Sequence, residues 1–205
     1  MKTQPSVNYF WAWKWSLSVF VLAASTGALM RYGLAYGFPF GLQFANLRHA
    51  HSHLMYFSWV TPVLIAMIAL YLPKVSDREL SRRFFRPITL SLILGVAAYV
   101  PFFLWGYSPV PASGLPMPPA VIGAGANIIG WYYFAWVYWQ ETRGIPRNFV
   151  LRMWDTSIIF MILATFGTWF LPVLTVLNIE NRFLSVMLTH IFLDLFSEGW
   201  FILAL

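Results

Sequence analysis

Six long apolar stretches dominate this sequence. They cover about residues 12–36, 48–72, 84–107, 119–140, 149–177 and 183–205, and a helix needs about 20 predominantly apolar residues to cross a bilayer. The chain is 60% hydrophobic and only 10% charged, whereas about a quarter of the residues in a soluble domain are charged. The sequence therefore predicts an all-α, polytopic integral membrane bundle with about six transmembrane helices in a single domain, 1–205.

The basic residues lie in short segments between these stretches. Segment 73–87 holds one lysine and four arginines, segment 140–152 holds three arginines, and segment 108–118 has no charged residue. Basic loops stay in the cytoplasm, so both termini are predicted to be cytoplasmic. The net charge of +6 then reports topology and not nucleic-acid binding. We expect a lipid bilayer as the surroundings, in a bacterial inner membrane.

The chain has no cysteine. This excludes disulfides, iron–sulfur clusters and thiolate-ligated haem. No internal repeat is evident in the sequence, and the last apolar stretch reaches Leu205 without a polar tail. We expect the chain to work with other membrane subunits, as a homo-oligomer, or as part of a longer polypeptide.

Three histidines stand at every second position where the second apolar stretch begins. They are His49, His51 and His53, and imidazole is well suited to hold a metal ion or haem iron at neutral pH. Polar groups at membrane depth are expensive and usually functional. The alternative is an interfacial cluster that only hydrogen-bonds lipid headgroups and water.

Helical spacing limits what these histidines can bind. His49 and His53 are four residues apart and share a face, whereas His51 is rotated by about 200° from His49. One helix can therefore offer two of the three to a single metal ion. Either His49 and His53 chelate one ion, or His51 or His53 alone is the axial ligand of a haem.

The sixth stretch carries the fourth histidine. His190, Asp194 and Glu198 follow one another at intervals of four residues, so they form a stripe on one helix face. In the predicted topology, His190 lies about 12 Å below Arg182, at a depth similar to that of the other histidines. The stripe suits a metal ligand with a supporting carboxylate, with Asp194 as an acid/base group, or a proton path. The alternative is a His–Asp pair that hydrogen-bonds between helices.

Four other polar residues fall within or beside the apolar stretches. Arg31 and Arg48 can neutralise haem propionates or extend to headgroups. Asp155 is predicted to form an interfacial ion pair with Arg152, and Asn127 is predicted to hydrogen-bond between helices.

Stretch Leu47–Leu54 and the position of His190 resemble the amino-terminal half of the catalytic subunit of haem-copper oxygen and nitric-oxide reductases. More loosely, the chain is similar to His-containing bacterial membrane proteins associated with nitric-oxide stress. The resemblance implies a low-spin haem ligand on the second helix and a metal-ligating His190 on the sixth. The family has about twelve helices and further ligands on the seventh and tenth, and its sixth-helix histidine is often followed by Tyr where this chain has Asp194. A second subunit, a second copy or a continuation of the chain would then supply the rest.

Three functions compete. The first is a haem- or copper-binding redox subunit with an extracytoplasmic histidine site, which works with a partner chain as an oxidoreductase if it is an enzyme. The second is an intramembrane zinc hydrolase resembling the ceramidase group, in which His49, His53 and His190 hold zinc and Asp194 transfers protons. The third is a non-catalytic helical subunit of a respiratory or photosynthetic complex.

Overall fold

A computed structural model describes residues 8–77, 79, 81–108, 110, 114, 117–177 and 179–205, and these residues contain helices and no strand. Six of the helices are long and apolar enough to cross a membrane, which confirms the predicted all-α fold. The described elements are α1 (Phe10–Tyr36), η1 (Pro39–Gly41), α2 (Phe44–His53), η2 (Leu54–Val60), α3 (Thr61–Ser76), η3 (Arg82–Phe84), α4 (Phe85–Trp105), α5 (Pro119–Thr142), α6 (Phe149–Val176), α7 (Arg182–Asp194), η5 (Leu195–Phe201) and α8 (Ile202–Ala204).

The second span is longer than its apolar stretch. It runs from Phe44 to Ser76, although the hydropathy pattern places its ends near 48 and 72. The turn before Arg48, residues 44–47, is already helical, so the histidines lie in the second and third turns of the helix and not at its start.

Contacts divide the chain into two compact units. The first comprises Met1–Ala66 and Ser81–Phe134, and the second comprises Met67–Leu80 and Ala135–Leu205. Helices α3 and α5 each contribute to both. A single domain stays a prediction.

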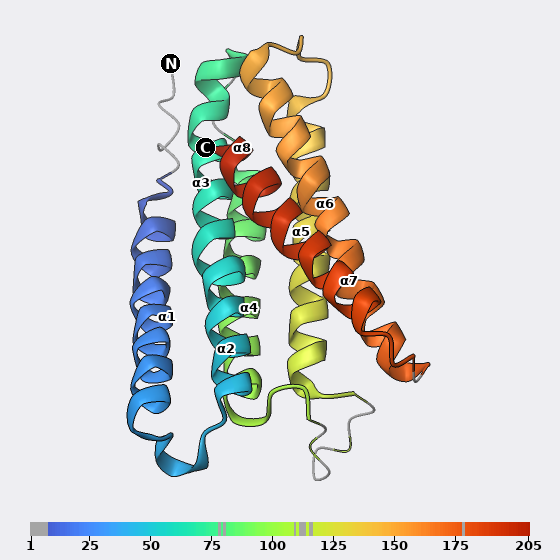
Figure 1. Cartoon of the computed structure of the whole chain (residues 1–205). Helices are drawn as coiled ribbons and strands as arrows, with labels where there is room; N and C mark the ends of the chain where they lie inside the picture. Colours follow the sequence, from blue (N-terminus) through green and yellow to red (C-terminus); the bar gives the residue numbers. More distant parts are fainter. Residues whose placement is uncertain are drawn as a thin grey trace. The chain divides into compact units, whose positions relative to one another are not determined.

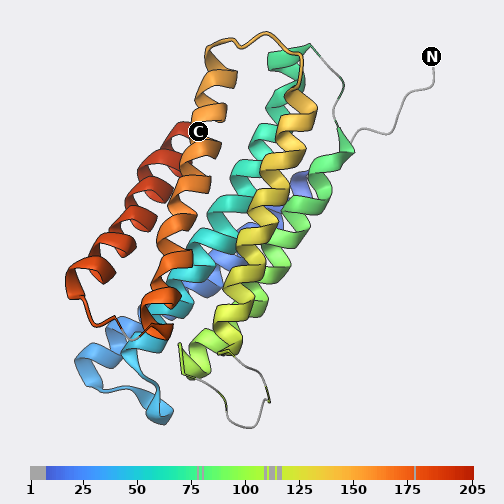
Figure 2. The ribbon, with the colours of Figure 1, turned by 90° about the vertical axis from the view of Figure 1, so that its right-hand side faces the viewer.

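The first unit is built around α2 and η2, which contact both α1 and α4. Figure 1 and Figure 2 show α1, α2 and α4 side by side. Two buried serines join η2 to α4: Ser91 Oγ donates to the carbonyl of Phe57 at 2.6 Å, and Ser58 Oγ donates to the carbonyl of Leu92 at 3.1 Å. Phe57 also meets the Trp131 ring of α5 edge-on, with centroids 4.9 Å apart.

The second unit pairs α6 with α7, and the two helices run alongside each other in Figure 2. Two glycines allow this close approach. A Cβ at Gly167 would collide with the backbone of Leu188, and a Cβ at Gly199 would collide with Phe160. The spans can pack tightly here because small residues let helix backbones approach each other in membranes.

The second and sixth spans follow the same succession of helix types, which the sequence does not predict. Each begins as an α-helix, continues as a π-helix of seven residues and then returns to α-helix. The two π segments are η2 and η5, and each has Trp at its sixth position, Trp59 and Trp200. π segments are rare in proteins, and those that occur often lie at functional sites.

The correspondence extends to the helix that precedes each of these spans. His51 and Phe192 both lie three residues before a π segment. The His51 ring packs over Gly27 of α1, and Phe192 packs over Gly167 of α6. In the same register, His49 corresponds to His190 and His53 to Asp194. The second and sixth spans therefore share an α–π–α course and, at one position, a matching contact with the helix that precedes each of them.

Candidate histidine site

The α2 histidines point to two faces of the helix. His51 faces α1, where its Nδ1 lies 2.8 Å from the carbonyl oxygen of Ala23. His49 and His53 face aromatic side chains of α4 and of the segment that follows it. This is the division that helical spacing predicts.

His53 has one hydrogen-bond contact and two aromatic contacts. Its Nδ1 lies 2.8 Å from the carbonyl oxygen of His49. Its ring lies on Phe102, with centroids 3.9 Å apart and planes tilted by 30°, and it meets Phe57 edge-on at 4.7 Å. His49 is placed by the edge of the Tyr107 ring, 4.7 Å away. Aromatic rings thus contact both imidazoles.

These contacts determine which nitrogen of His51 and His53 is protonated. A carbonyl oxygen can only accept a hydrogen bond, so Nδ1 must carry the hydrogen in both rings. A neutral ring then has its lone pair on Nε2. Metal-ligating histidines commonly have this arrangement, in which the second nitrogen donates to a backbone carbonyl or a carboxylate.

Both predicted propionate-binding arginines are exposed, Arg31 on α1 and Arg48 on α2. Neither has a salt bridge to a carboxylate among the described residues. Their positions allow contact either with an anionic group or with lipid headgroups.

His190 and Asp194 form a pair on α7. His190 Nδ1 lies 3.6 Å from a carboxylate oxygen of Asp194, and the two side chains are 64% and 62% exposed. This separation is longer than a hydrogen bond. His49 with His53 on α2 of the first unit, and His190 with Asp194 on α7 of the second, are each a local pair on one helix. Within the described residues, no three His, Asp or Glu side chains gather to hold a metal ion.

Two aromatic residues of the site were not predicted. Phe102 and Tyr107 enclose His49 and His53, and they come from the end of the third span and the segment after it. Aromatic residues at a span end usually indicate an interfacial belt, so nothing in the sequence distinguishes these two from the others.

Two polar interpretations require correction. Asp155 pairs with Arg147 and not with Arg152: Arg147 Nε lies 2.8 Å from one carboxylate oxygen, and the Tyr138 hydroxyl donates to the other at 2.9 Å. Arg147 also donates to the Thr142 carbonyl at 2.8 Å, so it joins the end of α5 to α6. Asn127 is fully buried, and neither of its amide atoms has a hydrogen-bond partner in the described part of the chain.

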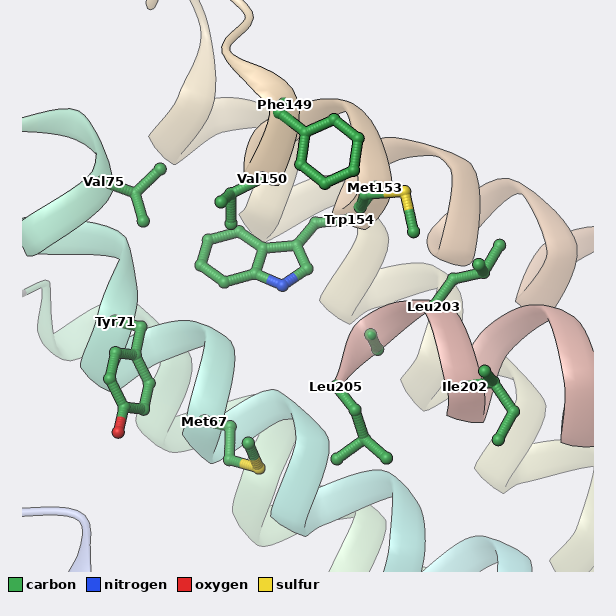
Figure 3. A pocket seen from close by; sticks show the side chains of 11 residues that line it. Met67, Tyr71, Val75, Phe149, Val150, Met153, Trp154, Ile202, Leu203 and Leu205 are labelled. Atoms are coloured by element: carbon green, nitrogen blue, oxygen red, sulfur yellow. The ribbon is translucent and has the colours of Figure 1, made fainter.

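A groove of about 470 Å³ lies in the second unit. Figure 3 shows side chains of α3, α6 and the end of the sixth span around it. Its lining is Met67, Tyr71, Val75, Phe149, Val150, Met153, Trp154, Ile202, Leu203, Ala204 and Leu205. Its lining side chains include no imidazole, carboxylate or amine.

Comparison of the chain with protein-family models, curated proteins and solved structures gave no match in any of the three.

Proposed function

We propose that this protein is a membrane redox subunit that holds haem or copper through histidines of its second span. The observation that carries the proposal is the pair of Nδ1–H bonds from His51 and His53 to backbone carbonyls, both 2.8 Å long. They leave Nε2 of each ring as the ligand nitrogen. An interfacial cluster that only contacts water would not require two imidazoles to be oriented in this way.

The two faces of α2 suit different cofactors. His53, with His49 beside it on the same face, offers two nitrogen ligands to a copper ion, a metal that imidazole binds well. His51, on the opposite face, offers one axial ligand to a haem, and the exposed Arg31 and Arg48 suit its propionates. Either cofactor would supply one-electron transfer, and the protein would set its orientation and surroundings.

The proposed topology places this site on the extracytoplasmic side. Both termini would be cytoplasmic, because the segments that contain most of the arginines follow the second and fourth spans. We place the protein in a bacterial inner membrane, where other membrane subunits would exchange electrons with it. His190 is a further candidate ligand, with Asp194 as the carboxylate beside it.

An ultraviolet–visible spectrum with metal analysis tests the proposal on the detergent-purified protein. We expect a Soret band or stoichiometric copper, lost in His53→Ala or His51→Ala and kept in Ser52→Ala. Ser52 is the matched control because it lies between them and only donates to the Arg48 carbonyl in its own helix. Stoichiometric zinc without haem or copper would overturn the redox function in favour of a hydrolase. A protein purified from its native membrane with no cofactor would also overturn it.

A further inference from the structure

Helix α7 presents ionisable side chains outward. None of its residues is buried, and His190 and Asp194 are both more than half exposed. An aspartate at the centre of a membrane helix is among the most unfavourable residues for insertion. Ionisable residues in spans nearly always face protein or water for this reason. Contact with lipid alone is therefore an unfavourable environment for this face.

The exposed residues of the sixth span follow one line. Phe183, Met187, His190, Asp194, Glu198 and Ile202 are all exposed and succeed one another at intervals of three or four residues. This spacing places side chains on a single helix face. We call this line the α7 stripe.

The second span shows how the corresponding face can be covered. There, the residues in register with His190 and Asp194 are His49 and His53, and they pack against Phe102 of α4. In the second unit, α7 and η5 have their main contacts with α6, through Phe192 at Gly167 and through Gly199 at Phe160. The described part of the second unit thus covers this side of the span and leaves the α7 stripe exposed.

We propose that a second copy of this chain covers the α7 stripe, and that His190 of each copy pairs with Asp194 of the other. Two copies inserted in the same membrane have the same orientation, so a two-fold axis along the membrane normal makes their α7 helices parallel. In such a symmetric interface, each contact occurs twice. One imidazole and one carboxylate in each copy make the stripe complementary to itself in charge. The polar site is incomplete in one chain and complete in two.

This inference does not depend on which cofactor the second span holds. It concerns a different unit and requires no metal at His190, and its experiments measure cross-linking and not cofactor content, so the failure of one proposal can be distinguished from the failure of the other.

Single cysteines test the interface directly, because the chain has none of its own. Met187→Cys places a thiol in the stripe and Val186→Cys places one beside it. Val21→Cys on α1 is the matched control because its side chain is also exposed. After mild oxidation in native membranes, we expect disulfide-linked dimers from Val186→Cys or Met187→Cys at ten or more times the yield from Val21→Cys. Equal yields at the three positions, or no dimer from either α7 variant, would overturn the second-copy proposal.

A second variant tests the polar pair. Asp194→Asn keeps the shape of the side chain and removes its charge, and it should lower the cross-linking yield of Met187→Cys several-fold. Thr156→Ala is the matched control. Thr156 is exposed on α6, and its hydroxyl donates only to the Arg152 carbonyl in its own helix. An unchanged yield in Asp194→Asn would contradict the proposed His190–Asp194 pairing between copies.

Discussion

At the scale of single residues, Gly27 determines how closely α1 approaches His51. A Cβ added there would lie 3.2 Å from Cε1 of His51, so the imidazole would have to shift and its bond to the Ala23 carbonyl would weaken. We expect Gly27→Ala to lower the free energy of unfolding by about 1 kcal/mol through overpacking. Thermal unfolding in detergent measures this change.

Gly130 on α5 is the control for that substitution. The nearest atom to an added Cβ there is Leu94 Cδ1, at 3.9 Å, an ordinary contact distance. Gly130→Ala should therefore raise stability by about 0.5–1 kcal/mol through helix propensity alone. If both variants changed stability in the same direction, Gly27 would not have the role assigned to it.

The Asp155 carboxylate supports a second prediction at this scale. Asp155→Ala removes the acceptor of both the Arg147 guanidinium and the Tyr138 hydroxyl. Hydrogen bonds to charged groups contribute about 1.5–3 kcal/mol, and the carboxylate is 30% exposed, so we expect a loss near the lower end. Arg152→Ala should change stability by less than about 0.5 kcal/mol, because Arg152 is exposed. An equal loss in both variants would favour the Asp155–Arg152 pair that the sequence suggests.

At the scale of elements, the π segment η2 sets the rotation of the histidines relative to α3. Deleting Met55 removes the additional residue of the wider turn, and one residue corresponds to about 100° of helix rotation. His49 and His53 would then turn away from Phe102. We expect the deletion to abolish cofactor binding while helical content, measured by circular dichroism, stays the same.

Met55→Ala separates the role of helix geometry from that of the side chain. It keeps the length of the segment, so the histidines keep their orientation, and we expect cofactor binding to persist. A deletion variant that still bound its cofactor would show that the π segment is not needed to orient the ligands.

The elements also show what a sequence can and cannot predict. Six spans are evident because each needs about 20 apolar residues, a length that hydropathy alone detects. The π segments are not evident, because Leu54–Val60 and Leu195–Phe201 have no local pattern that differs from an α-helix. The shared course of the two spans is not evident for a related reason: residues at matching backbone positions differ in type, as His53 and Asp194 illustrate.

For the site, helical spacing places His51 apart from His49 and His53. The partners of these histidines depend on tertiary packing. Phe102 is one of many aromatic residues at span ends, and the sequence shows no reason to choose it. The sequence favours Arg152 as the partner of Asp155 because it is only three residues away along the chain. The observed partner, Arg147, lies in a loop, and only the folded chain brings it to the carboxylate.

At the scale of the whole molecule, the orientation in the membrane can be tested with thiol chemistry, since the chain has no cysteine. Ser108→Cys and Arg143→Cys both replace exposed residues outside the spans. With a membrane-impermeant thiol reagent, we expect Ser108→Cys to react in intact cells and Arg143→Cys to react only after permeabilisation, as the positive-inside rule requires. The reverse pattern would place the histidine cluster on the cytoplasmic side.

The second and sixth spans combine one backbone course with different polar side chains. The same α–π–α course presents two imidazoles in one span and an imidazole with a carboxylate in the other. One helix course therefore accepts either an imidazole or a carboxylate at the residue before its π segment, His53 in one span and Asp194 in the other. Exchange of these two side chains would then alter the donor atoms of each pair without a change in the course of the helices.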